Sequence, residues 1–135
     1  MIKRLLTTPA TWAVVGLSGN TRRTAYSIGQ YLRDRLGMSI VPVNLRGEDA
    51  LGELGYRRLA DVPCSVQVVD CFVNSQRVGV IVDEAIAEKD RLGIKAVWLQ
   101  LGVIDEAAAE RARAVGLDVV MDTCPAMETP AAAAN

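Results

Sequence analysis

The sequence contains no histidine. This absence excludes Ser-His-Asp and Cys-His catalysis, histidine metal sites and a phosphohistidine intermediate, because each of them needs an imidazole. Cysteines are few as well: Cys64, Cys71 and Cys124 are odd in number and widely spaced. Such spacing fits neither a disulfide framework nor a set of metal ligands. We therefore expect three free, buried thiols in a reducing compartment and no metal site.

An excess of charge and a long apolar run are also missing. The formal net charge is -1 over 135 residues, which argues against a general nucleic-acid binder. No apolar run approaches the roughly 20 residues that span a bilayer, and Leu5-Leu6 is too short for the core of a signal peptide. We expect a cytoplasmic protein with a single domain over residues 1–135, in which 129–135 form a flexible tail.

Residues 12–31 carry the pattern around which the rest of the chain is organised. An apolar run at 12–15 ends abruptly at Gly16, and residues 16–23 are small, polar and basic. Apolar residues then recur at helical spacing, at Ala25, Ile28, Leu32 and Leu36. This succession predicts a strand, a tight turn and a helix, and the continuous apolar strand is typical of a sheet covered on both faces.

The turn has the features of an anion site. Gly16 permits unusual backbone conformations and the close approach of a ligand. The helix after the turn directs its unpaired N–H groups back toward it. Ser18 and Asn20 add neutral donors, and Arg22 and Arg23 add positive charge, although we expect only one of the two arginines to touch a ligand. The turn therefore predicts a pocket for a phosphate or pyrophosphate, in preference to a plain connection between strand and helix.

Four more strands come after this unit, separated by two helical patterns that end at Gly93 and Gly116. The predicted strands are residues 39–44, 66–72, 96–101 and 117–121. Alternating strands and helices predict an α/β fold: a Rossmann-type, doubly wound parallel sheet of about five strands with helices on both faces. Ligands bind beyond the carboxyl ends of such strands. The segments that meet at this rim are 16–23, 44–46, 70–72, 100–102 and 122–125.

The turn is not the dinucleotide fingerprint, because Gly16 and Gly19 have no third glycine in register. The second predicted strand ends in Asn44 with Arg46 shortly after it, and it lacks the carboxylate that holds the ribose of NAD. A ligand with a phosphate on its ribose fits better. The pattern leaves NADP and coenzyme A (CoA) both open.

Four residues near the rim each have two interpretations. Asp70 either caps a helix or holds a loop amide, or else it contacts a ligand. Trp98 fits the core better than a stacking platform. Gln100 closes an apolar strand at the rim, which favours a functional role. Cys124, next to Pro125, is either a structural thiol or a reactive one, depending on its pKa.

Five segments together resemble a known family. They are Val15-Gly16-Leu17-Ser18-Gly19-Asn20-Thr21-Arg22-Arg23-Thr24-Ala25-Tyr26, Val41-Pro42-Val43-Asn44, Val69-Asp70-Cys71-Phe72, Val97-Trp98-Leu99-Gln100-Leu101-Gly102 and Asp122-Thr123-Cys124-Pro125. The chain from about residue 12 to 128 resembles the small stand-alone CoA-binding domain proteins, relatives of the N-terminal domain of the succinyl-CoA synthetase alpha subunit.

The resemblance implies a Rossmann-type domain that holds CoA, or an acyl-CoA, along the strand rim. It implies that the phosphates lie at the turn, at Gly16, Ser18, Asn20 and Arg23. It places the adenosine part along Pro42, Val43 and Asn44, with Phe72 near the same groove. With Arg22, Arg46 and Gln100 from the residue patterns, these are the candidate ligand-binding residues.

We expect binding without catalysis, because no base–nucleophile couple is readable and the ligase relatives carry their chemistry on other domains. Two alternatives remain open. One is an NADP-dependent reductase that uses the same rim. The other is a nucleotide-sensing regulatory module whose ligand state is read by a protein partner. No nucleic acid or membrane is expected as a partner.

Overall fold

The computed structural model describes residues 1–128, so the predicted flexible tail at 129–135 lies outside the described residues. Five strands form one parallel sheet in the order β2-β1-β3-β4-β5. They are β1 (Thr11–Val15), β2 (Ser39–Val43), β3 (Val68–Cys71), β4 (Ala96–Leu99) and β5 (Asp118–Val120). This arrangement confirms the predicted Rossmann-like α/β fold.

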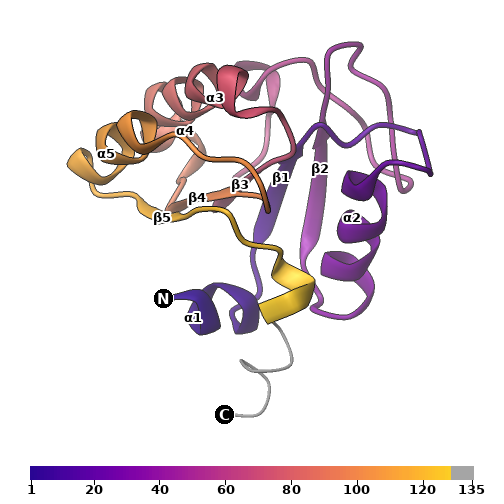
Figure 1. The fold of residues 1–135 in the computed structure, drawn as a ribbon. Helices are drawn as coiled ribbons and strands as arrows, with labels where there is room; N and C mark the ends of the chain where they lie inside the picture. Colours follow the sequence, from indigo (N-terminus) through magenta and orange to yellow (C-terminus); the bar gives the residue numbers. More distant parts are fainter. Residues whose placement is uncertain (129–135) are drawn as a thin grey trace.

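Helices cover both faces of the sheet (Figure 1). The short helix α1 (Ile2–Thr7) and α2 (Thr24–Asp34) lie on one face; α3 (Ser75–Ala87), α4 (Lys89–Leu92) and α5 (Glu106–Ala114) lie on the other. A 3-10 turn, η1 (Leu59–Asp61), precedes β3, and a helical turn at 125–128 comes after β5. None of the described helices is long and apolar enough to cross a membrane.

Alternating strand residues build two cores, one under each helical layer. The α3–α5 side buries Ala13, Val69 and Val97, whereas the α1–α2 side buries Trp12 and Trp98. The two indole rings lie 5.5 Å apart between centroids. Trp98 is fully buried, and its indole N–H donates to the carbonyl oxygen of Thr123 at 2.8 Å. The assignment of Trp98 to the core is confirmed.

The sheet differs from the sequence prediction mainly at the strand ends. β3 begins at Val68 rather than at residue 66, and β4 ends at Leu99 because the chain turns at Gly102, whose φ is +84°. Proline within the second strand is tolerated because β2 is an edge strand. Helix α1 was not predicted; it owes its place to Leu5 and Leu6, which are buried against the sheet.

Candidate functional site

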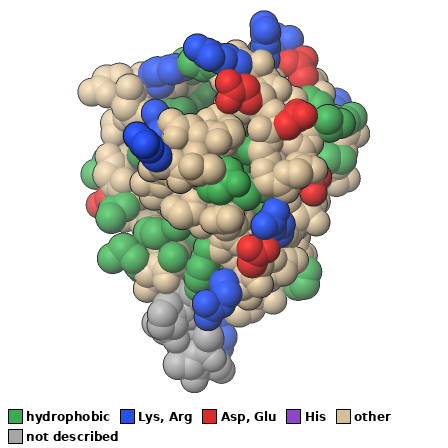
Figure 2. Space-filling model, turned by 90° about the vertical axis from the view of Figure 1, so that its right-hand side faces the viewer, with side chains coloured by type: hydrophobic (Ala, Val, Ile, Leu, Met, Phe, Trp, Pro, Cys, Tyr) green, Lys and Arg blue, Asp and Glu red, His purple; other side chains and the backbone are tan. Residues whose placement is uncertain are grey.

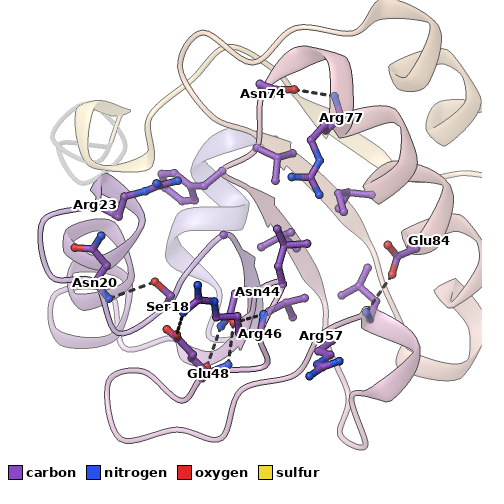
Figure 3. A pocket seen from close by; sticks show the side chains of 18 residues that line it. Ser18, Asn20, Arg23, Asn44, Arg46, Glu48, Arg57, Asn74, Arg77 and Glu84 are labelled. Atoms are coloured by element: carbon purple, nitrogen blue, oxygen red, sulfur yellow. Dashed lines mark hydrogen bonds and ion pairs between the residues drawn. The ribbon is translucent and has the colours of Figure 1, made fainter.

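The strand order reverses between β1 and β3, which are neighbours at the centre of the sheet. After β1 the chain turns to α2 on one face, and after β3 it turns to α3 on the other. A crevice forms where the chain departs in opposite directions from adjacent strands. The structure has a cleft of about 660 Å³ at this point, between the residues that come after β1, β2 and β3 (Figure 3).

The loop after β1 forms the first wall of the cleft. Gly16 has a φ of +106°, and a Cβ atom on it would lie 2.7 Å from the carbonyl oxygen of Phe72. Glycine is therefore required here by backbone conformation and by the close passage of the chain after β3. The amide oxygen of Asn20 accepts from the backbone N–H of Arg22 at 3.1 Å, and the backbone N–H of Asn20 donates to the hydroxyl of Ser18 at 3.3 Å. These bonds fix the loop from within.

Asn44, directly after β2, organises the second wall. Its Nδ2 donates to the carbonyl oxygens of Leu17 at 2.8 Å and Glu48 at 2.9 Å. Its Oδ1 accepts from the backbone N–H groups of Glu48 at 2.8 Å and Arg46 at 3.2 Å. Because the amide is occupied on both sides, Asn44 ties the loops after β1 and β2 together.

Helix α3 forms the third wall and brings a cation that the sequence analysis missed. The side chain of Asn74 accepts from the backbone N–H of Arg77 at 3.0 Å, so Asn74 caps the amino end of α3. Arg77 lies in the first turn of α3, and its side chain lines the cleft. Arg57, from the loop before η1, also lines the cleft. Figure 3 shows Arg77 reaching in from the α3 side and Arg23 from the loop after β1. The position of Arg77, three residues after a cap at the rim, was the available signal.

The electrostatics of the cleft favour an anion. Four arginines line it against two glutamates. Arg46 lies 3.8 Å from Glu48, but Arg23, Arg57 and Arg77 form no ion pair with any residue of the described chain, 1–128. The first turns of α2 and α3 both begin at the cleft and add their partial positive charge. Basic side chains also gather along the upper edge of the molecule in Figure 2, the side of the carboxyl ends of the strands.

Most of the candidate residues come together. The main cleft is lined by eight of them: Gly16, Ser18, Asn20, Arg23, Val43, Asn44, Arg46 and Phe72. Gln100 lines an adjoining cavity of about 420 Å³. Arg22 and Pro42 line neither space: Arg22 is exposed on the loop, and Pro42 is buried within β2. Ligand contacts at all of these residues stay predictions.

Beneath the adjoining cavity lies a buried polar pair. Asp70 is fully buried, and its Oδ1 accepts from Nε2 of Gln100 at 2.5 Å, while its Oδ2 has no partner among the described residues. Burial raises the pKa of Asp70 to about 7, against the lowering effect of the Gln100 bond. Asp70 therefore holds a side-chain amide, rather than the helix cap or loop amide considered from the sequence.

No group of three or more His, Cys, Asp or Glu side chains within residues 1–128 is arranged to hold a metal ion. The cysteines are free thiols in three environments. Cys71 is fully buried on the α3–α5 side, and burial with the neighbouring Asp70 raises its pKa. Cys64 is exposed before β3, and Cys124 is half-buried after β5, so the expectation of buried thiols is wrong for these two, which lie in segments outside the buried strands.

The parallel five-stranded sheet and its cationic rim cleft define an α/β protein of the Rossmann-like class. Comparison with known protein families narrows the assignment further. The family described as "CoA binding domain" matches residues 10–130, and the chain belongs to this family.

Three similar proteins indicate how far the likeness extends. The chain is 30% identical to "Uncharacterized protein YneT" of Bacillus subtilis over 123 residues, which cover 91% of this chain and 87% of that protein. A solved structure, "hypothetical protein from Pyrococcus horikoshii OT3", superposes with a TM-score of 0.87 at 31% identity, over 98% of this chain and 89% of the other.

The third is the "Acetate--CoA ligase [ADP-forming] II subunit alpha" of Pyrococcus furiosus, with 25% identity over 101 residues. The match covers 75% of this chain but only 21% of the ligase subunit. The likeness is therefore to one segment of a much longer protein.

Proposed function

We propose that this chain, as a single unit, binds CoA or an acyl-CoA in the cleft without catalysing a reaction on it. The observation that carries the proposal is the cleft at the reversal point, where Arg23, Arg57 and Arg77 have no ion-pair partner among the described residues. Unpaired guanidinium groups around a cavity favour phosphate groups, which they bind through charge-assisted hydrogen bonds. Family membership supports CoA as the source of those phosphates.

In this proposal the pyrophosphate lies between the loop after β1 and the first turn of α3. Arg23 and Arg77 flank that space, and two helix N-termini begin there. The adenosine part runs along the wall after β2, with its ribose phosphate near Arg46 and Arg57. The side chain of Arg46 is 85% exposed, and its ion pair with Glu48 is long, at 3.8 Å. A ligand phosphate therefore has access to the guanidinium of Arg46.

The composition of the cleft favours holding a ligand over redox chemistry on NADP. Hydride transfer needs a bound substrate and usually a proton donor beside the nicotinamide. Neither cavity is lined by a lysine or a tyrosine. Of the two carboxylates in the main cleft, Glu84 is engaged, because it accepts from the backbone N–H of Leu59 at 3.3 Å.

Two neighbouring arginines provide a matched test of the proposal. Arg23 lines both cavities, whereas the adjacent and likewise exposed Arg22 lines neither. We expect Arg23→Ala to weaken CoA binding by about 1.5–3 kcal/mol in a calorimetric titration, the value of a hydrogen bond to a charged group. Arg22→Ala is the control and retains the affinity within about 0.5 kcal/mol. Equal losses in the two variants, or none in Arg23→Ala, would contradict the assignment.

A further inference from the structure

The second cavity continues the main cleft along the rim, past the carboxyl ends of β3 and β4. Arg23, Phe72 and Val73 line both spaces. The other walls of the second cavity are mostly apolar, formed by Ala25, Leu101, Val103 and Met127. A ligand whose phosphates lie in the main cleft can therefore extend a narrow, largely apolar arm into the second cavity.

One polar side chain in this lining has a fixed orientation. Gln100 is 4% exposed, and its Nε2 donates to Asp70. Above its pKa of about 7, Asp70 is a carboxylate, which accepts hydrogen bonds and does not donate them, so at about pH 8, where thiol exchange is measured, it fixes which end of the Gln100 amide it holds. The other end, Oε1, accepts no hydrogen bond from the described residues, and Gln100 lines the cavity. Buried acceptors are normally hydrogen-bonded, so Oε1 of Gln100 is available to accept from a ligand, and an amide N–H is a suitable donor.

A thiol lies in the same cavity. Cys124 lines it, together with Gln100 and Met127. The other two thiols are placed differently, because Cys71 is buried on the opposite side of the sheet and Cys64 is exposed before β3, at the amino ends of the strands. Among these cysteines, only Cys124 is within reach of a molecule in the cavity.

The geometry points to a covalent docking site for an arm that carries amides and ends in sulfur. Gln100 accepts a hydrogen bond from an amide of the arm, and Cys124 exchanges with the arm when it arrives as a disulfide. The inference rests on the proposed function, since CoA ends in such an arm. In the exchange, the Cys124 thiolate attacks one sulfur of the incoming disulfide. A bond forms between Cys124 and the arm, the incoming S–S bond breaks, and the leaving thiolate takes up the proton that Cys124 released.

Two disulfides separate recognition of the arm from simple accessibility. Pantethine carries the amide arm but no nucleotide and no phosphate, and 2-hydroxyethyl disulfide carries neither amide nor arm. Peptide mapping by mass spectrometry gives the rates of modification at Cys124 and Cys64, with the exposed Cys64 as internal reference. We expect the Cys124-to-Cys64 ratio to be about tenfold higher with pantethine, because binding precedes exchange. Equal ratios with the two reagents overturn the proposal, as does preferential pantethine modification of Cys64.

Two variants test the role of Gln100. Gln100→Met retains the length of the side chain and removes the acceptor, so we expect the pantethine ratio to fall about fivefold, the value of one neutral hydrogen bond. The ratio for 2-hydroxyethyl disulfide stays unchanged. Asp70→Asn retains the size of Asp70 but lets the Gln100 amide bind it in either orientation, so we expect about a twofold fall for pantethine alone. A pantethine ratio unchanged in both variants overturns the role of Gln100.

The outcome is independent of the phosphate site. Pantethine lacks the groups that Arg23, Arg57 and Arg77 are proposed to bind, so its reaction at Cys124 does not require them. Loss of CoA binding in the calorimetric titration with retained pantethine selectivity contradicts the proposed phosphate site alone. Tight CoA binding without pantethine selectivity contradicts the docking site alone.

Discussion

Asp70 offers a test of the buried polar pair through the pH dependence of stability. Its carboxyl group is fully buried, and its hydrogen-bond partner among the described residues is Nε2 of Gln100. Desolvation raises its pKa from 3.8 in the unfolded chain to about 7 in the folded protein. Cys71, the titrating neighbour, has its own pKa raised and remains a neutral thiol near neutral pH. The substitution Asp70→Asn removes the titration of Asp70 and retains an oxygen for Gln100.

Proton binding sets the sign of the effect. Between the two pKa values of Asp70 the folded state holds more protons than the unfolded state, so the free energy of unfolding falls as pH rises. The contribution is fully present below about pH 4 and is lost as pH rises through about 7. The rise in the pKa of Asp70 from 3.8 to about 7 corresponds to about 4 kcal/mol of unfolding free energy at most.

Urea unfolding of the wild type and Asp70→Asn from about pH 4 to about pH 8 isolates this contribution, because all other titrating groups are common to both proteins. We expect the asparagine variant to gain stability relative to the wild type as pH rises, by as much as about 4 kcal/mol. A difference that stays constant with pH would mean that Asp70 has an ordinary pKa. A difference that changes in the opposite direction would mean that a donor stabilises the carboxylate at Oδ2.

Two further predictions concern the loop after β1 and the start of α3. In urea unfolding, Gly16→Ala lowers the free energy of unfolding by at least about 2 kcal/mol, because position 16 has a left-handed φ and the added Cβ would lie 2.7 Å from the carbonyl oxygen of Phe72. Gly19→Ala is the control: its Cβ would lie 3.7 Å from the nearest atom, so the free energy of unfolding changes by about 0.5 kcal/mol or less. Arg77→Ala weakens CoA binding by about 1.5–3 kcal/mol in a calorimetric titration. Gln76→Ala, at the exposed neighbouring position, is the control and leaves the CoA affinity unchanged. Wild-type CoA affinity in Arg77→Ala would refute the role of Arg77.

The fold was predictable because local signals agreed with the tertiary structure. The helices that precede β4 and β5 end at Gly93 and Gly116, and both glycines have the left-handed φ that a helix end requires. Helix α1 was missed because six residues carry too little pattern, and its position depends on contacts of Leu5 and Leu6 that exist only after folding. The break between α3 and α4 at Glu88 likewise has no sequence signal.

The candidate site was predictable where it lies within one continuous segment. The loop after β1 carries its glycine, donors and arginine in sequence order, so the pattern of residues 16–23 was enough to indicate them. Arg57 and Arg77 come from other segments, where an isolated arginine looks like any surface charge. They line the same cleft as Arg23 because of the sheet order, which periodicity does not specify.

The role of Asn44 was only partly foreseen. Its position after the second strand placed it at the rim, where the structure has it lining the cleft. Its side chain, however, makes four hydrogen bonds to the backbone of the loops around it. Sequence reasoning does not distinguish a side chain that supports a wall from one that faces the ligand, because both lie at the same strand end.

The most direct test of the central claim is a side-by-side calorimetric titration of this protein with CoA and with NADP. Both ligands carry a pyrophosphate and an adenosine with a phosphate on its ribose, at the 3′ oxygen in CoA and at the 2′ oxygen in NADP, and they differ most beyond the pyrophosphate. CoA continues as a narrow arm, which we propose to enter the second cavity, whereas NADP ends in a second ribose and a planar nicotinamide. We expect CoA to bind at least about tenfold more tightly, a difference of about 1.4 kcal/mol. Equal or tighter binding of NADP would contradict the account and favour the reductase.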